Sequence, residues 1–295
     1  MRVLIASDLS EASDEAVKQG VELSAGSPVA LCHVMAEPGM HALFPQDYED
    51  DVRRQTAMQP RVADALRDQL ARLLPRAKVT PEVFIEIGSE ADALLRRAEA
   101  WEAELIAVGT HGKKGLRRLL LGSLADQIVR SAHCQVLVAR PGREGAVLAA
   151  TDLTDPGLPA IEAAAAESQR RGRRLVVMHA MEFLTEADAS LGLMGALPAL
   201  ETEDTRSVKR ALASQIIESA LQRLDAKGEI VIADDDAPGE TLRLADALPA
   251  QLIVVGTHGR SGLARVVLGS RATRIIENAP CSVLVVRQTS SSAHA

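Results

Sequence analysis

The chain has 295 residues, enough for two ordinary domains that each bury a core. Hydrophobic residues make up 47% and charged residues 25% of it, a composition typical of a soluble globular protein. The net charge of −7 and the aromatic content of 2% argue against nucleic-acid binding, because neither half is basic and stacking platforms are scarce.

The N-terminus and the cysteines indicate a cytoplasmic protein. Arg2 is followed at once by a strand pattern, so no signal peptide is expected. No apolar run approaches the length of a membrane span, so no membrane partner is expected. Cys32, Cys134 and Cys281 lie in apolar surroundings and are expected to be buried thiols in a reducing compartment.

The first half alternates strand patterns with helix patterns. Short apolar runs predict strands buried on both faces of a parallel sheet, at residues 3–6, 29–34, 83–87, 105–108 and 136–139. Ser10 or Ser13 is expected to cap the first helix. The polar stretch 37–60 is expected to be a loop before a helix whose buried stripe is Val62, Leu66, Leu70 and Leu73 or Leu74. Two more helices are expected, at 91–102 and after Gly122.

The second half repeats this order. Its strands are expected at residues 147–150, 175–178, 230–233, 252–255 and 283–286. The seam is the short stretch from Arg140 to Arg143, which predicts domains 1–143 and 144–295. Five strands with interleaved helices in each half predict two tandem α/β domains with doubly wound parallel sheets. Asp234, Asp235 and Asp236 are expected to form a solvated loop, with a cation site as the alternative.

One segment occurs twice. GTHGKKGLRRLLLGS, from Gly109 to Ser123, returns as GTHGRSGLARVVLGS from Gly256 to Ser270. Each copy begins at a strand end, where positive φ at glycine and close approach to the backbone are possible, and ends at a helix start. Because amides and the helix dipole at a helix start favour anions, the two copies predict two polyphosphate sites. Tight turns and a helix cap alone explain the glycines equally well at this point.

Neither known phosphate loop matches these copies, since GxxxxGK[ST] and GxGxxG are both missing. The spacing G-x2-G-x9-G-[S/T], with an aspartate after the first strand, instead resembles the universal stress protein family. The resemblance covers both halves and implies a tandem member of the ATP-binding type, with an adenine nucleotide alpha hydrolase-like fold. It also implies ATP as the ligand, with Mg²⁺ on its phosphates, and fifth strands that meet so that the halves form an intramolecular pseudo-dimer.

The family motif maps onto this chain residue by residue. In the first half it implies a nucleotide site made of Ser7, Asp8, Val34, Val108, Gly109, Gly112, Lys113, Gly122 and Ser123. In the second half it implies Thr151, Asp152, Ala180, Val255, Gly256, Gly259, Arg260, Gly269 and Ser270. The aspartates are implied near the adenine, with a helix N-cap as the alternative role, and Val34 and Ala180 would line the adenine pocket. His33 and His179 are expected to be core histidines rather than ligands.

The two predicted sites differ in charge. Asp126 follows Ser123 within the first helical turn, where a capping carboxylate would compete with phosphate. Arg271 and Arg274 occupy the corresponding helix of the second half. The second site is therefore expected to hold a triphosphate at least as well as the first.

Three functions remain open from the sequence. The first is an ATP-binding regulatory protein of the universal stress type, with unknown protein partners and a possible homodimer. The second is a slow ATPase or phosphotransferase, although no acidic residue is placed to activate water or a hydroxyl beside the glycine loops. The third is a nucleotide-free scaffold or small-ligand binder. No catalytic residue and no metal ligand from the protein is predicted.

Overall fold

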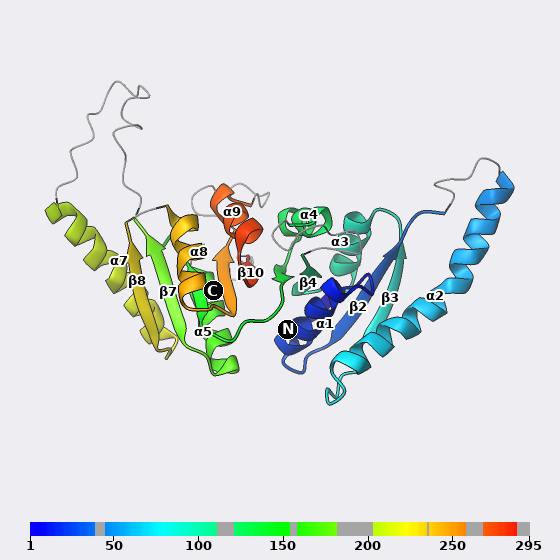
Figure 1. The fold of residues 1–295 in the computed structure, drawn as a ribbon, viewed down its shortest axis with the longest axis horizontal. Coiled ribbons are helices and arrows are strands. Elements are labelled where there is room, and N and C mark those ends of the chain that lie inside the picture. The colour runs from blue at the N-terminus through cyan, green and yellow to red at the C-terminus, as the bar shows by residue number, and fades with distance from the viewer. Residues whose placement is uncertain are drawn as a thin grey trace, which may run out of the picture. The chain divides into compact units, whose positions relative to one another are not determined.

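The computed structural model describes residues 1–38, 45–110, 121–153, 158–181, 203–234, 236–257 and 268–287 (Figure 1). The chain divides into two compact units, one made of Met1–Gly142 with Ser282–Ala295, the other of Arg143–Cys281. The division lies at the predicted seam. It differs from the predicted domains in its last segment, which joins the first unit.

The first unit contains a parallel sheet built from β1 (Val3–Ala6), β2 (Val29–Met35), β3 (Glu82–Ile87), β4 (Leu105–Gly109) and β5 (Gln135–Ala139). Its order is β3-β2-β1-β4-β5. Val3, Leu4 and Ile5 have no exposed surface, as expected for a strand covered on both faces. The helices of this unit are α1 (Glu11–Ser24), α2 (Pro45–Leu73), α3 (Glu90–Ala100) and α4 (Ser123–Ser131).

The strand β10 (Ser282–Val286) completes the first unit by pairing antiparallel with β5. Val283 faces Val138 and Val285 faces Val136, so the two fifth strands meet as predicted. Arg287, which is only 4% exposed, donates its Nη2 to the carbonyl oxygen of Val129 near the end of α4. A cation there is favoured by the helix dipole and ties β10 to this unit.

The second unit contains the parallel strands β6 (Val147–Ala150), β7 (Leu175–Ala180), β8 (Gly228–Ala233) and β9 (Leu252–Gly256), in the order β9-β6-β7-β8. Its helices are α5 (Leu158–Arg171), α7 (Glu203–Arg223), α8 (Ala237–Ala247) and α9 (Ser270–Asn278). The helix α5 packs on β6 and β9, α7 packs on β8, and α8 packs on α9. The helix α8 also packs on β6 and β7.

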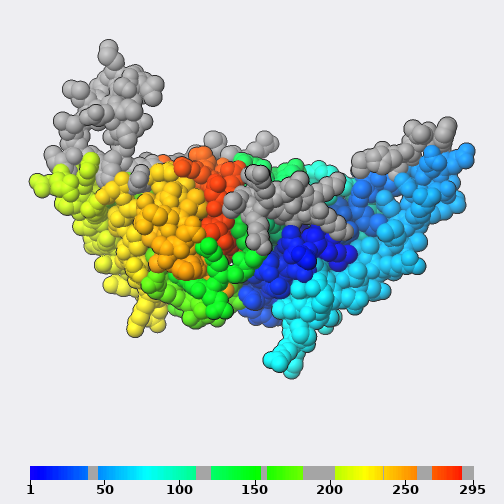
Figure 2. Space-filling view, viewed as in Figure 1, coloured from blue at the N-terminus to red at the C-terminus, as the bar shows by residue number. Residues whose placement is uncertain are grey.

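The loop prediction for residues 37–60 is wrong from Pro45 onward. The helix α2 begins there and includes Pro60. Its first turns were missed because they are exposed and lack an apolar period: Tyr48 is 51% exposed and Met58 is 49% exposed. Figure 2 shows α2 in light blue at the surface of this unit. An ion pair within the helix compensates locally for the missing apolar face, since the Arg53 guanidinium lies 3.3 Å from the carboxylate of Glu49, one turn earlier. The predicted stripe is confirmed at Leu66 and Leu70, which are buried.

Candidate functional site

The same polar turn follows the first strand of each unit. Leu9 and Leu153 adopt left-handed backbone conformations, with φ of 63° and 59°. In each turn the leucine amide donates, at 3.1 Å, to a hydroxyl two residues earlier, that of Ser7 or Thr151. These hydrogen bonds hold an otherwise unfavourable backbone and present Asp8 and Asp152 at the strand ends.

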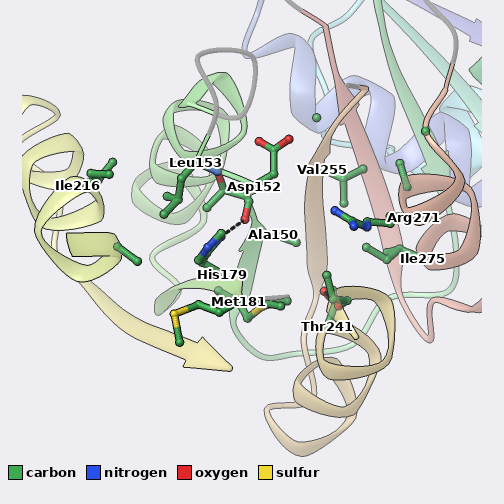
Figure 3. A pocket seen from close by; sticks show the side chains of 18 of the residues that line it. Ala150, Asp152, Leu153, His179, Met181, Ile216, Thr241, Val255, Arg271 and Ile275 are labelled. Carbon is green, nitrogen blue, oxygen red and sulfur yellow. Dashed lines mark hydrogen bonds between the residues drawn. The ribbon is translucent and has the colours of Figure 1, made fainter. Parts of the chain in front are cut away.

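A histidine on the neighbouring strand fixes each turn. His33 Nδ1 lies 2.8 Å from the carbonyl oxygen of Ser7, and His179 Nδ1 lies 2.9 Å from that of Thr151. This is the satisfied role expected of both histidines. Figure 3 shows the second of these contacts and places His179 in the wall of a cavity. The sequence did not predict that His179 lines the site, although its repetition at the same place in both halves was a signal.

The last glycine of each repeat, next to serine, starts a helix as predicted. Gly122 and Gly269 are the N-caps of α4 and α9, and their amides donate to the carbonyl oxygens of Thr110 at 2.7 Å and Thr257 at 3.1 Å. Their φ angles are −68° and −65°, so neither cap uses the left-handed region. The serines that follow occupy the first helical position rather than the cap.

Gly109 is required by packing. A Cβ on this residue would lie 2.6 Å from the carbonyl oxygen of Ala12, in the first turn of α1. Its φ is not positive either. This glycine therefore permits α1 to approach the end of β4, a role that the sequence interpretation assigned to a ligand or to a special φ.

The second unit contains a cavity of about 860 Å³ at the carboxyl ends of β6, β7 and β9 (Figure 3). Such a volume lies in the range of small-molecule sites. All the described positions predicted for the second site line this cavity: Thr151, Asp152, Ala180, Val255, Gly256, Gly269 and Ser270. Four separate segments of the chain thus bring them together. Gly259 and Arg260 lie outside the described residues.

The cavity also has walls that the sequence interpretation missed. The helix α7 contributes Lys209, Leu212, Ala213 and Ile216; α8 contributes Ala237 and Thr241; α9 adds Arg271, Ala272 and Ile275. Figure 3 shows Ile216 on one side, with Arg271 and Ile275 on the other. The missed residues of α7 and α8 lie on helices that carry no motif of their own, so only the fold brings them to the strand ends, whereas Arg271 of α9 directly follows the motif serine.

The corresponding turn of the first unit is tied into a buried network. Ser7 Oγ donates to Gln69 Oε1 at 2.7 Å, and Gln69 Nε2 donates to Asp14 Oδ1 at 2.7 Å. Arg72 Nη2 then lies 3.1 Å from both carboxylate oxygens of Asp14. Gln69 is 3% exposed, so these partners satisfy a polar group that is otherwise costly to bury. Ser7 is thereby joined to α2.

The other predicted residues of the first site take varied positions. Asp8 Oδ1 accepts from the Ser10 amide at 3.0 Å, and Ser10 is the N-cap of α1, so the capping alternative for Asp8 is wrong. Val34 is half-buried on β2 and Val108 is buried on β4. Ser123 is exposed at the start of α4. Gly112 and Lys113 lie outside the described residues.

Ion pairs change two expectations about charge and add partners to the acidic triplet, whose Asp234 and Asp236 are exposed as expected. The carboxylate of Asp126 accepts from Arg130 Nε at 2.9 and 3.0 Å, instead of completing a cap with Ser123. Arg274 Nη1 lies 2.7 Å from Asp236 Oδ2, and Arg274 is not among the residues that line the cavity.

Asp236 also caps α8 by accepting from the Gly239 amide at 3.2 Å. Asp234 pairs with Arg210. Within the acidic triplet these two aspartates therefore stabilise structure, while Asp235 lies outside the described residues.

Other candidate chemistry is limited in the part of the chain that the structure describes. There, no cluster of three or more His, Cys, Asp or Glu side chains is placed to hold a metal ion. The three cysteines are buried, as predicted. Burial raises the pKa of the Cys32 thiol to about 12 and that of Cys134 to about 11, which makes both poor nucleophiles. Across the same described residues, none of the helices has the length and apolar character needed to cross a bilayer.

Comparison with known families gives two matches along the chain. The model of the universal stress protein family matches residues 1–140 and again 145–287. A universal stress protein of Mycolicibacterium smegmatis is 27% identical over an alignment of 307 positions, which covers 97% of this chain and 96% of that protein. A universal stress protein of Mycobacterium tuberculosis is 29% identical over 199 residues, where the match spans 64% of this chain and 63% of that relative's length.

Solved structures show the same fold. A universal stress protein from Archaeoglobus fulgidus superposes with a TM-score of 0.64 at 17% identity, covering 98% of each chain. A protein from Pseudomonas aeruginosa described as a putative universal stress protein superposes with a TM-score of 0.63 at 17% identity, covering 97% of this chain and 92% of the other. At such identities the likeness concerns the fold alone.

Proposed function

The chain belongs to the universal stress protein family, and we propose that it is a regulatory protein whose second unit binds ATP in the cavity at the ends of β6, β7 and β9. The observation that carries this proposal is convergence. The positions predicted for the second site came from a motif and two strand ends that are far apart in the sequence, yet every described one lines a single cavity. This cavity has the size of a small-molecule site and lies at the strand ends, where open parallel sheets bind ligands.

The lining suits the parts of a nucleotide. Ala180, Val255 and Ile275 offer apolar surface to a base, while Asp152 offers acceptors for an exocyclic amino group. The start of α9 offers amides and the Ser270 hydroxyl to phosphate oxygens. Asp152 is the one carboxylate among the described lining residues, so Mg²⁺ would enter on the phosphates of ATP rather than be held by a cluster of protein ligands.

The lining favours ATP binding with at most slow hydrolysis of the bound ATP. Rapid hydrolysis requires a base that activates water next to the terminal phosphate. We assign Asp152, the one carboxylate of the described lining, to recognition of the base.

The proposal is tested by calorimetric titration of the full chain with ATP in magnesium buffer. Ala180→Leu places a larger side chain in the cavity, and Ala233→Leu is its control, because Ala233 is the register partner of Ala180 on β8 and does not line the cavity. We expect Ala180→Leu to weaken one binding event by roughly tenfold or more, equivalent to about 1.4 kcal/mol, with Ala233→Leu close to wild type. Absence of binding by the wild-type protein, or equal effects of the two variants, would contradict the proposal.

A further inference from the structure

The two repeats differ directly after their shared Gly-Ser pair. Gly122 and Ser123 are followed by Leu124, whereas Gly269 and Ser270 are followed by Arg271. Both residues lie in the first turn of a helix, α4 or α9. The second repeat therefore has a guanidinium where the first has an apolar side chain.

Arg271 belongs to the wall of the second cavity. It lines the cavity together with Ser270 and Ala272, and Figure 3 shows it on the same side as Val255 and Ile275. The hydrogen-bond ladder of α9 begins with the Thr273 amide, which donates to the Gly269 carbonyl oxygen at 2.9 Å. The backbone amides of Ser270, Arg271 and Ala272 precede this first hydrogen bond and lie at the positive end of the helix dipole.

The charges around the two helix starts are opposite. The first turn of α4 contains Asp126, while that of α9 contains no acidic residue. Across the second cavity, Lys209 of α7 adds a second cation to the wall, against the single carboxylate of Asp152. Arg274, one turn after Arg271, is directed to Asp236 and stays outside the lining. The described lining thus contains two cations, Arg271 and Lys209.

We propose that Arg271 is a specificity-determining residue, which makes the second site select nucleotides with phosphates beyond the first. This inference rests on the proposed function, since it concerns the same cavity. A guanidinium at the start of α9 is suited to a polyphosphate, because its planar fork pairs with two phosphate oxygens while the helix amides hold a neighbouring group. A nucleoside or a nucleoside monophosphate that binds through its base gains little binding free energy from the Arg271 guanidinium.

The test is a titration series of the full-length protein with adenosine, AMP and ATP in magnesium buffer. Arg271→Leu introduces the residue found in the first repeat. We expect it to weaken ATP binding about tenfold, the lower end for a charge-assisted hydrogen bond because Arg271 is exposed, and to leave adenosine and AMP almost unchanged. Arg271→Lys should lose less affinity for ATP than Arg271→Leu, because lysine retains the positive charge. Added salt should reduce the difference between Arg271→Leu and wild type.

Arg274→Leu is the matched control, since it removes the same charge from the same helix at a position that does not line the cavity. It should preserve the ATP-to-AMP ratio. In an Ala180→Leu background, the remaining binding belongs to the first unit, and Arg271→Leu should not change it. Equal losses for all three ligands, or none, would overturn the role of Arg271 while leaving the proposed function intact. If wild type binds none of the ligands, the proposed function fails as well.

Discussion

The turns after β1 and β6 share one backbone design but differ in what lies behind them. In the first unit, Ser7 is joined through Gln69 to Asp14 and Arg72, so buried polar groups connect the turn with α2. Six residues after the strand-end aspartate, the second unit has Leu158 where the first has Asp14. The buried residues of α7 are all apolar, and the Thr151 turn lines a cavity instead. Duplication thus preserved the turn while the supporting helix acquired a different chemistry.

This difference shows that a shared motif does not imply a shared environment. A buried polar network restricts its members to a few geometries, because each donor and acceptor needs its partner. Apolar side chains pack with less directional demand, and they leave room when they are small. The following variants test whether the network and the cavity are properties of separate units, beginning with the largest expected effect.

Gly109→Ala should destabilise the first unit most. The added Cβ meets the Ala12 carbonyl oxygen at 2.6 Å, a backbone atom that moves only with α1. We expect a loss of about 2–3 kcal/mol in the free energy of unfolding, measured by urea denaturation. Gly142→Ala is the control, because a Cβ there meets nothing within 4 Å, and its effect should stay within about 0.5 kcal/mol. Similar stabilities for the two variants would refute the packing role of Gly109.

Gln69→Leu should break the polar network of the first unit. The replacement removes the acceptor of the Ser7 hydroxyl and one of the donors to the Asp14 carboxylate in a buried setting, which should cost about 2 kcal/mol of unfolding free energy. ATP binding assigned to the second unit should persist in this variant. Gln222→Leu, at an exposed position of α7, is the control and should change little. A stability equal to wild type would show that the network contributes nothing.

Alkaline pH should weaken the first unit through its thiols. Burial raises the pKa of Cys32 from 9.0 to about 12 and that of Cys134 to about 11, so the folded state retains protons that the unfolded state releases. Their contribution is complete below pH 9 and is lost as pH rises toward these values, at about 1 kcal/mol for Cys32 by pH 10. Cys32→Ala should therefore make stability less dependent on pH between 8 and 10. An unchanged pH dependence would contradict this assignment.

Much of the strand pattern was predictable because its signal is local. Continuous apolar runs placed β1 and β6 at the observed residues, and the Gly-Ser pairs marked the starts of α4 and α9. The first half of α2 was missed because an exposed, charged helix has no apolar period. The partners of Arg274 and Asp126 were missed because ion pairs depend on where helices and loops meet, or on rotamers within one helix.

The sequence by itself determined the duplicated fold, the family and the residues of the repeated motif, since short-range patterns encode these. Only the tertiary structure decided that β10 belongs with the first unit, that Gly109 accommodates α1, and that α7, α8 and α9 close a cavity around the second motif. The physical reason is distance along the chain. Pairing, close backbone approach and cavity walls join residues that are far apart in sequence, and no local propensity records which of them will meet.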